Sequence, residues 1–415
     1  MDNLLVWKFG GSSVSSVDRI RHVAALIEAA VMAGSKLVVV VSAMGSYTDE
    51  LLTLAYSLSK RPPERELDML VTTGERISIS LLSIALAAKQ VRSLSLTGSQ
   101  SGILTDEAHG NARIIGIRGD RIIAGLDQVP VVIVAGFQGV SPKTRDITSL
   151  GRGGSDLSAV ALAIRLQAGR CDIFTDVRGV LSADPDKVSQ AKLIRQIPWD
   201  VMNDFSWCGA GVLHHRAAHL AAAYRMPVLI RSSFEPEREG TLIMGDSSVE
   251  NVHMIACAHK EQQCLLTMTG PAAAGTDGFR RHSELLEWLW KREESPLISN
   301  FYRDHSAFRM TLLFHEKFAD DACDLLRKSE AAESCPDSSS GISLHRGCAA
   351  VSLIGSGFRQ HPLSVRQADD VTEHFCLFRD LQDRSLNFVI PADKLSETLE
   401  KFHSLVAHCT SPAEA

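Results

Sequence analysis

Short apolar runs alternate with longer stretches of helical spacing over residues 1–245. The runs are rich in β-branched residues and apolar without interruption, which is typical of strands buried on both faces. Such strands separated by helices predict an α/β domain with a mainly parallel sheet, a three-layer αβα sandwich. The predicted strands lie at residues 4–9, 37–41, 131–137, 173–177 and 227–230.

The pattern changes after residue 250. Strand-like runs such as "CLLTMTG" and "LNFVI" alternate there with amphipathic stretches such as "ADKLSETLEKFHSLV". This predicts two small α+β modules, at residues 250–340 and 341–410. The polar run "SEAAESCPDSSSG" predicts an exposed loop and the final "SPAEA" a frayed tail.

Composition narrows the class of protein. A net charge of -6 argues against general attraction to nucleic acid or an anionic membrane. The nine cysteines form no C-x-x-C pair, which favours reduced thiols in a cytoplasm over disulfides or a zinc site. The first residues do not resemble a signal peptide and no apolar run reaches membrane-spanning length. We therefore expect a cytoplasmic protein whose partners are small molecules and other subunits.

Four of the predicted strands end in a polar residue or turn followed by glycine: "WKFGG", "VVSAMG", "VAGFQG" and "FTDVRG". Ligands of open α/β sheets bind outside the carboxyl ends of the strands, so these ends predict one shared crevice. Glycine also ends strands for structural reasons alone. That plainer interpretation suits any single end, but four ends with ionisable residues attached favour a site.

Two glycine-rich loops carry the candidate chemistry. Lys8 closes the first strand and precedes two glycines, which is typical of a phosphate-binding turn. In "GRGGSDLSAVALA" three glycines surround Arg152 at the predicted start of a helix, where an anion is favoured and Arg152 could clamp a carboxylate. Neither loop has the Walker or dinucleotide spacing. Glu75 begins another predicted helix, where it is either an ordinary first-turn charge or a ligand for an ammonium group.

With these motifs in order, the sequence resembles an aspartokinase of the amino-acid kinase superfamily. The segments "KFGGSSV", "VVSAMGSYTDELL", "TTGERIS", "VAGFQGV", "LGRGGSDLSAVALA" and "TDVRGVLSADP" occur in the family's order and spacing. The resemblance implies the amino-acid kinase fold, followed by two ACT modules that bind a regulatory amino acid. It also implies transfer of the γ-phosphoryl group of ATP, with Mg²⁺, to the side-chain carboxylate of L-aspartate.

The resemblance also assigns roles to residues. Lys8 and Asp156 would be catalytic, and no residue is assigned to bind the metal ion directly. The substrate amino acid would be held by Thr48, Glu75, Arg152, Gly153, Gly154 and Ser155. The nucleotide would be bound by Lys8, Phe9, Gly10, Gly11, Thr175, Asp176, Val180, Leu181, Ser182, Ala183, Asp184, Pro185 and Gly211.

Three positions depart from the family pattern. Leu181 stands where tyrosine is usual, Asp186 where arginine is usual, and Gly211 where lysine is usual. Lys187 could replace a lost cation if its loop shifts by one residue. Three functions therefore stay open: an aspartokinase with altered nucleotide affinity, which we favour, a kinase for another amino acid or carboxylate, and a non-catalytic regulatory partner.

The first ACT-like module lacks the family's usual D-x-P-G turn and has "TGPAAAGTDGF" there. Whether lysine, threonine or neither regulates the protein is therefore not readable from the sequence. A homodimer or higher homo-oligomer is implied by the resemblance alone.

Overall fold

The computed structural model describes residues 4–246, 253–292, 294–331, 341–360 and 362–409. The chain divides into two compact units. The first consists of Met1–Val180, Leu193–Ser206 and Gly211–Ser247, and the second of Leu181–Lys192, Trp207–Ala210 and Ser248–Ala415. The short segments Leu181–Lys192 and Trp207–Ala210 both precede residue 245, where the sequence predicts the end of the first domain. The expected domain boundaries therefore stay a prediction.

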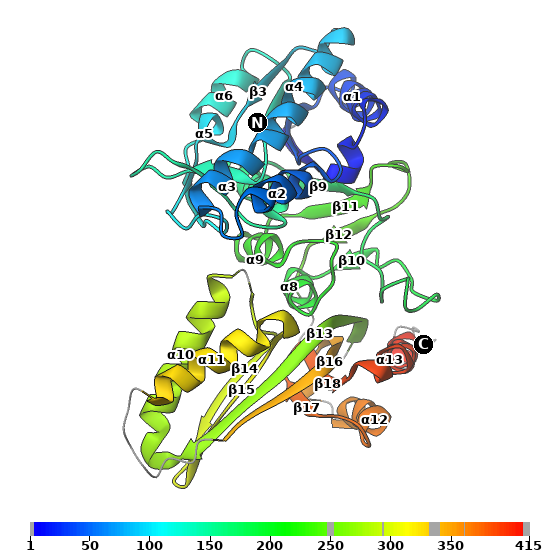
Figure 1. Ribbon diagram of the computed structural model, residues 1–415. Coiled ribbons are helices and arrows are strands. Elements are labelled where there is room, and N and C mark those ends of the chain that lie inside the picture. Colours follow the sequence, from blue (N-terminus) through cyan, green and yellow to red (C-terminus); the bar gives the residue numbers. More distant parts are fainter. Residues whose placement is uncertain (1–3, 247–252, 293, 332–340, 361, 410–415) are drawn as a thin grey trace. The chain divides into compact units, whose positions relative to one another are not determined.

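The main sheet of the first unit has the strand order β10-β12-β11-β9-β1-β2-β6-β3. Figure 1 labels β3, β9, β10, β11 and β12 of this sheet. Its neighbouring strands are parallel except for the antiparallel pair β11 and β12. The predicted mainly parallel sheet is thus confirmed. The strands are β1 (Leu4–Phe9), β2 (Lys36–Val41), β3 (Ser93–Leu96), β6 (Val131–Ala135), β9 (Arg170–Thr175), β10 (Gln196–Ile197), β11 (Val228–Ser232) and β12 (Thr241–Ile243).

Helices cover both faces of this sheet. On one face, α1 (Val17–Met32) and α4 (Thr73–Ala88) pack against side chains such as Phe9, Val39 and Ile133. On the other face lies α7 (Gly154–Arg165), which packs on β1, β2 and β9. The remaining helices are η1 (Gly11–Val14), α2 (Tyr47–Leu58), α3 (Glu64–Val71), α5 (Gly98–Ser101), α6 (Asp120–Leu126), α8 (Trp199–Trp207) and α9 (His215–Tyr224).

A second, smaller sheet of the first unit has the order β5-β4-β7-β8. Its strands have only three or four residues each, too short for hydrophobic alternation to reveal them in the sequence. They are β4 (Ile103–Thr105), β5 (Ile114–Ile117), β7 (Gln138–Val140) and β8 (Ile147–Ser149).

One helical stretch, Glu64–Ala88, is long and apolar enough to cross a membrane by length and composition. The expectation that no apolar stretch reaches that length was therefore wrong. In this fold 44% of its most apolar window is buried, and α4 packs in the core of the first unit. A core helix passes the same length test, so the stretch is weak evidence for a membrane span.

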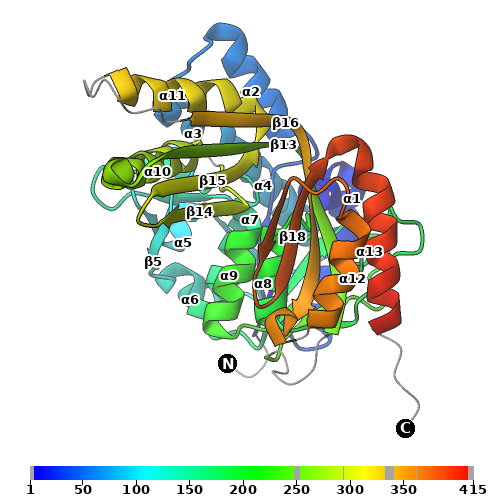
Figure 2. The same ribbon diagram turned by 90° about the horizontal axis from the view of Figure 1, so that it is seen from below.

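The second unit is built on a six-stranded antiparallel sheet with the order β14-β15-β13-β16-β18-β17. Its two central strands, β13 (His253–Pro271) and β16 (Gly341–Ser356), pair along most of their length (Figure 2). The outer strands are β14 (Ile298–Arg303), β15 (Ala307–His315), β17 (Phe378–Leu381) and β18 (Ser385–Pro391).

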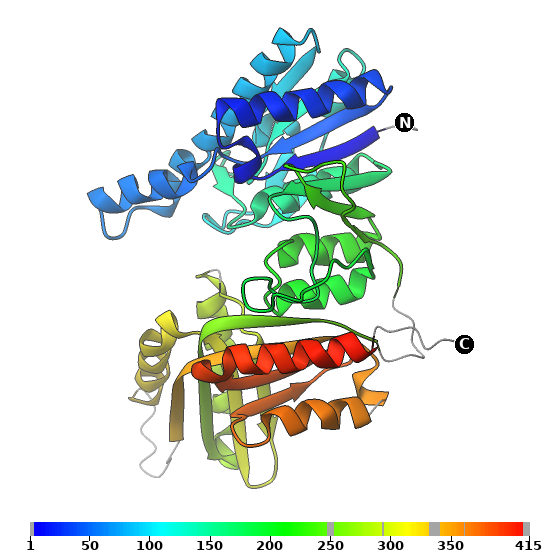
Figure 3. The same cartoon turned by 90° about the vertical axis from the view of Figure 1, so that its right-hand side faces the viewer.

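Two hydrophobic cores form on this sheet, and each contains residues of both expected ACT-like modules. In the first, α10 and α11 pack on β13 and β15 through residues such as Leu285, Leu326 and Phe314. In the second, α13 packs on β13 and β16, and α12 on β18, through residues such as Phe402 and Phe388. Figure 3 shows α12 in orange and α13 in red beside this sheet. The helices are η2 (Ala272–Ala274), α10 (Gly275–Trp290), η3 (Glu316–Phe318), α11 (Ala319–Ala331), η4 (Phe358–Gln360), α12 (Pro362–Thr372), η5 (Ala392–Lys394) and α13 (Leu395–Cys409).

The predicted polar loop falls mainly on residues 332–340, outside the described residues, and so does the predicted tail. The segment "TGPAAAGTDGF" ends β13, forms η2 and begins α10. The strand-to-helix connection is thus kept although the usual turn residues are missing.

Candidate active site

A buried ion pair lies at the carboxyl end of β1. The side chains of Trp7 and Phe9 face α1 and α4, so alternation along the strand directs Lys8 to the opposite face, where α7 lies. Lys8 Nζ lies 2.6 Å from Oδ1 of Asp156, in the first turn of α7. The two residues are only 8% and 7% exposed. The pair fixes the lysine ammonium group at the edge of the sheet where a ligand is expected.

The glycines after Lys8 lie in a crowded turn. A Cβ atom at Gly11 would lie 3.0 Å from the carbonyl oxygens of Ala43 and Gly45. One at Gly10 would lie 3.4 Å from Lys8 Nζ. The missing side chains therefore let the turn lie against the segment that follows β2 and leave the lysine head uncovered on that side.

The second glycine-rich loop brings α7 to the same edge. Gly153 has a φ of 72°, a left-handed conformation that glycine adopts without strain. A Cβ atom there would overlap the ring of His214 at 2.5 Å. The first turn of α7 then places Ser155, whose Oγ lies 2.8 Å from Oγ of Ser42 after β2. The positive end of this helix therefore points to the carboxyl edge of the sheet, as predicted.

Glu75 is buried in the first turn of α4, and no salt bridge joins it to another described residue. It is 2% exposed, and its Oε1 accepts a hydrogen bond of 3.1 Å from the backbone N–H of Ala43. Its Oε2 has no hydrogen-bond partner in the described part of the chain. Burial raises the pKa of Glu75 to about 7, and backbone hydrogen bonds oppose this shift. An ammonium group would supply the partner that this carboxylate lacks.

Arg152 and Thr48 lie in more exposed positions. The Arg152 side chain is 84% exposed and its guanidinium lies 4.0 Å from the carboxylate of Asp49. Thr48 is half-buried in α2. An exposed ion pair this long is weak, so Arg152 can turn toward a ligand at little cost.

Thr175 and Asp176 end β9, the strand beside β1. The Thr175 hydroxyl donates a 2.9 Å hydrogen bond to Asp176 Oδ1. The backbone N–H of Gly10 donates to the carbonyl of Phe174 in the same strand at 3.3 Å. The four strands whose sequences end in glycine, β9, β1, β2 and β6, are neighbours in the parallel sheet. Their carboxyl ends therefore lie along one edge, as the sequence predicts.

The other predicted nucleotide residues fall in both units. Val180 is buried in the first unit, whereas Leu181–Lys192 belongs to the second. Ser182 and Ala183 are 6% and 4% exposed, so their side chains pack inside that unit. Asp184 is half-buried and Pro185 is exposed, and these two remain accessible to a ligand.

The positions that depart from the family pattern can be located as well. Gly211 is exposed, and a Cβ atom there would meet nothing within 4 Å. Asp186 is exposed, and its backbone N–H donates to Asp184 Oδ1. Lys187 Nζ lies 2.6 Å from Glu261 Oε1, which raises the pKa of this lysine. In this structure Lys187 is paired with a carboxylate, and its replacement of a lost phosphate-binding cation stays a prediction.

Two residues of the site carried no assigned role in the sequence. The backbone N–H of His214 donates to Asp156 Oδ2 at 3.4 Å, and its ring covers Gly153. Ser42 bonds Ser155. Both lie in segments that match the family, "VLHHRA" and "VVSAMG", but only packing reveals that they hold Asp156 and Ser155 in place.

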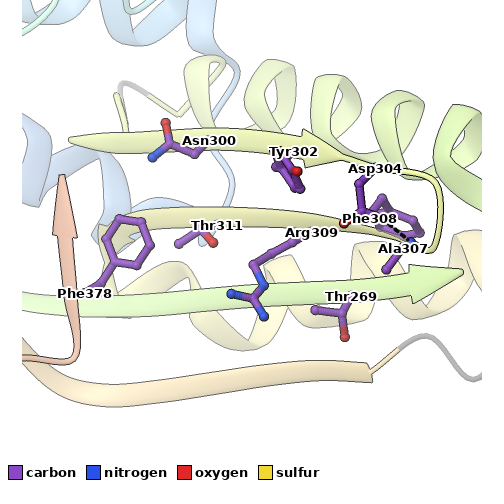
Figure 4. A pocket seen from close by; sticks show the side chains of 9 residues that line it. All are labelled: Thr269, Asn300, Tyr302, Asp304, Ala307, Phe308, Arg309, Thr311 and Phe378. Carbon is purple, nitrogen blue, oxygen red and sulfur yellow. Dashed lines mark hydrogen bonds between the residues drawn. The ribbon is translucent and has the colours of Figure 1, made fainter. Parts of the chain in front are cut away.

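A pocket of about 440 Å³ lies on the sheet of the second unit (Figure 4). Arg309 supplies a cation to its wall, and Tyr302 and Phe378 supply aromatic surface. None of its residues was expected to be functional. The lining consists of Thr269, Asn300, Tyr302, Asp304, Ala307, Phe308, Arg309, Thr311 and Phe378.

Comparison with known proteins agrees with this arrangement. Residues 3–232, more than half of the chain, match the model of the amino acid kinase family. The chain therefore belongs to the amino acid kinase family. Over 396 residues it is 44% identical to an aspartokinase of Mycolicibacterium smegmatis, which covers 90% of this chain and 86% of the relative. Within that family the chain is thus an aspartokinase, as the sequence predicts.

Two further relatives support this placement. Aspartokinase 2 of Bacillus subtilis is 41% identical over 362 residues, covering 86% of each chain. An aspartokinase of Geobacillus stearothermophilus is 50% identical over 269 residues. That match covers 64% of this chain and 65% of the length of the Geobacillus relative. Each of these relatives is named an aspartokinase.

Solved structures share the fold over nearly the whole chain. Escherichia coli aspartokinase III in complex with aspartate and ADP superposes with a TM-score of 0.81 at 24% identity, covering 98% of this chain and all of that one. Aspartate kinase from Synechocystis superposes with a TM-score of 0.54 at 31% identity, covering 99% of this chain and 70% of that one. The predicted fold class is confirmed.

Proposed function

We propose that the protein transfers the γ-phosphoryl group of ATP to the side-chain carboxylate of L-aspartate, forming 4-phospho-L-aspartate and ADP. The observation that carries this proposal is the buried Lys8–Asp156 pair at the carboxyl edge of the sheet, in a chain of the aspartokinase family. A side-chain carboxylate is already ionised at neutral pH, so the reaction needs no general base. Positioning and charge stabilisation remain.

Lys8 would offset the charge on the phosphoryl group as it passes from ADP to the carboxylate oxygen. The new bond joins that oxygen to the γ-phosphorus, and the bond from phosphorus to the β,γ-bridging oxygen breaks, with its electrons leaving on ADP. Asp156 would hold Lys8 in place at 2.6 Å, and the His214 N–H would orient Asp156. Such preorganised charges are the largest contribution to many transfer reactions.

The acceptor would be bound by groups of opposite charge. Glu75, buried with an unpartnered oxygen, suits the substrate ammonium group. Arg152, exposed and weakly paired, suits the α-carboxylate through two parallel hydrogen bonds. Thr48, Gly153, Gly154 and Ser155 are the further residues assigned to the amino acid by family resemblance.

Mg²⁺ would enter the site with the nucleotide. Within the described residues no group of three or more His, Cys, Asp or Glu side chains could hold a metal ion. Mg²⁺ commonly keeps several of its waters and binds through substrate phosphates with few protein ligands. When bound it would neutralise part of the phosphate charge, and Lys8 would act on the remainder.

Regulation and assembly are part of the same proposal. One solved relative, E. coli aspartokinase III, is described in complex with lysine and aspartate. We extend this to lysine or threonine as an effector at the ACT-like modules of residues 250–340 and 341–410. We also expect a homodimer or higher homo-oligomer that works in a cytoplasm.

An acyl phosphate assay separates the alternatives. ATP-dependent formation of a hydroxamate from hydroxylamine and aspartate would support the proposal. Product only with another carboxylic acid would favour a different acceptor. A folded but silent protein would favour the non-catalytic regulatory partner.

A further inference from the structure

The segment Leu181–Lys192 carries five residues that family resemblance assigns to the nucleotide, yet it packs in the second unit. Ala183 and Val188 are 4% and 5% exposed and belong to the hydrophobic core that α13 builds on the sheet. Phe402 of α13 lies in the same core. The segment is therefore an integral part of the second unit.

Ser182 connects the segment to β13 and α13 of the second unit by hydrogen bonds. Its carbonyl accepts a 2.8 Å bond from the N–H of Cys257 in β13. Its hydroxyl lies 2.9 Å from Nε2 of His403 in α13 and accepts a 2.9 Å bond from the N–H of Lys192. Because that hydroxyl already accepts from Lys192, it can donate its own proton to His403. The histidine thus holds the point where the two ends of the segment meet.

The imidazole suits this contact. His403 is 5% exposed, and its pKa is lowered, first by burial and then by the nearby charge of Lys192. A neutral ring with a free nitrogen lone pair can accept the serine proton. A buried hydrogen bond of this kind costs free energy when one partner is removed, because the other is left unsatisfied.

The residues that flank the segment, which belong to the first unit, are also held by hydrogen bonds. The carbonyl of Val180 accepts from the N–H of Ile194 at 2.9 Å. The Thr241 hydroxyl accepts from the N–H of Val180 at 2.8 Å and donates to the carbonyl of Ile194 at 2.6 Å. These bonds hold the residues that flank the segment. The course of the segment between them therefore depends on its contacts with β13 and α13 of the second unit.

A second contact lies nearer the surface. Lys187 pairs with Glu261 of β13 at 2.6 Å, and His259 Nε2 lies 3.4 Å from the same glutamate. The Glu261 side chain is 49% exposed. An exposed pair contributes little to stability, so the buried bond of Ser182 with His403 is the stronger of the two contacts.

We propose that His403 is a positioning residue for the nucleotide: through Ser182 it holds Leu181–Lys192 in the conformation that contacts ATP. This rests on the proposed assignment of the segment to the nucleotide. Without the bond only a fraction of molecules would have the segment in place. The apparent affinity for ATP would then be the intrinsic affinity multiplied by that fraction. Aspartate is assigned to other residues, so its affinity should not change.

The test compares His403→Leu, His403→Gln and Ser182→Ala with the unchanged protein. We expect the KM for ATP to rise roughly five- to tenfold in His403→Leu and Ser182→Ala, while the KM for aspartate stays within twofold. Glutamine can bond the serine hydroxyl, so His403→Gln should recover most of the ATP affinity. The matched control is His374→Leu, the same substitution at an exposed position of the second unit.

The proposal is overturned if folded His403→Leu keeps its KM for ATP, or if both KM values rise together. Circular dichroism checks the fold, and Ser182→Ala keeps the test open if His403→Leu does not fold. If the unchanged protein forms no hydroxamate, the proposed function fails by itself. The dissociation constant of ADP, measured by calorimetry on the same variants, then decides the positioning role.

Discussion

Lys8 and Glu75 are both almost fully buried, but the groups that surround their side-chain charges differ. Lys8 has a counter-charge 2.6 Å away in Asp156. Glu75 accepts a backbone hydrogen bond from Ala43, and its Oε2 has no hydrogen-bond partner among the residues that the structure describes. The first arrangement pairs a buried cation with an anion, whereas the second leaves a carboxylate that a positive group could pair with. Each arrangement gives a prediction.

Lys8→Ala should lower kcat about a thousandfold, because it removes a preorganised charge from the transferring phosphoryl group. It should also lower the melting temperature, because Asp156 is left as an unpaired buried charge. Adding Asp156→Asn should restore much of the melting temperature but not the activity. Near-normal turnover in folded Lys8→Ala, followed by hydroxamate formation, would rule out the phosphate role.

Glu75→Gln should change the pH dependence of stability. The folded-state pKa near 7 exceeds the ordinary 4.5, so the folded state binds the proton more tightly and wild-type stability falls as pH rises from about 4.5 to 7. The glutamine variant lacks this loss of about 2–3 kcal/mol. Relative to wild type, it should therefore be more stable at pH 8 than at pH 5 in urea unfolding. A difference that is the same at both pH values would contradict the buried carboxylate.

At the scale of elements, the glycine loops fix how strands and helices meet. Gly153 lets α7 begin beneath the His214 ring, and Gly11 lets the turn after β1 lie against backbone carbonyls. A Cβ atom would be too close to its neighbours at these two positions. Glycine is therefore favoured there, whereas an ordinary loop would tolerate many residue types. The sequence predicted glycine-rich ligand loops, but the close contact with His214 depends on α9, which lies 60 residues further along the chain.

Gly153→Ala should be costlier than a glycine substitution without close neighbours. Gly34 is a matched control, because its φ of 89° is also left-handed and nothing lies within 4 Å of its Cβ position. Gly34→Ala should cost about 1 kcal/mol from backbone strain alone. Gly153→Ala should cost more and raise the KM for aspartate, since the ring of His214 must move. Equal unfolding free energies for the two variants would show that the ring yields freely.

At the scale of the whole molecule, the sequence predicted the fold class and the strand ends well because both depend on local patterns. Continuous apolar runs mark buried parallel strands wherever they occur. The membership of Leu181–Lys192 in the second unit was not predictable. Ala183 and Val188 look like ordinary loop residues until Phe402, more than 200 positions away, packs in the same core. The length of β13 was not predictable for a similar reason, because it depends on pairing with β16, which lies far along the chain.

The two ACT-like modules should fold only together, because β13 and β16 pair along most of their length. A chain that ends at residue 340 loses β16 and the whole core of α12 and α13. We expect its residues 253–331 to be cleaved rapidly in limited proteolysis, while the first unit resists. Co-expression of residues 341–415 should restore protection. A protease-resistant module in the shorter chain would show that the first module folds alone.

The division of the chain also limits how this protein can be recombined. A kinase fragment cut at residue 245 would carry Ala183 and Val188 without the core that covers them. Transplanting another regulatory module onto it would replace the surface to which Leu181–Lys192 is fitted. Chimaeras should therefore keep this segment and the rest of its unit from one parent, even though the segment ends at Lys192 and most of the unit begins at Ser248.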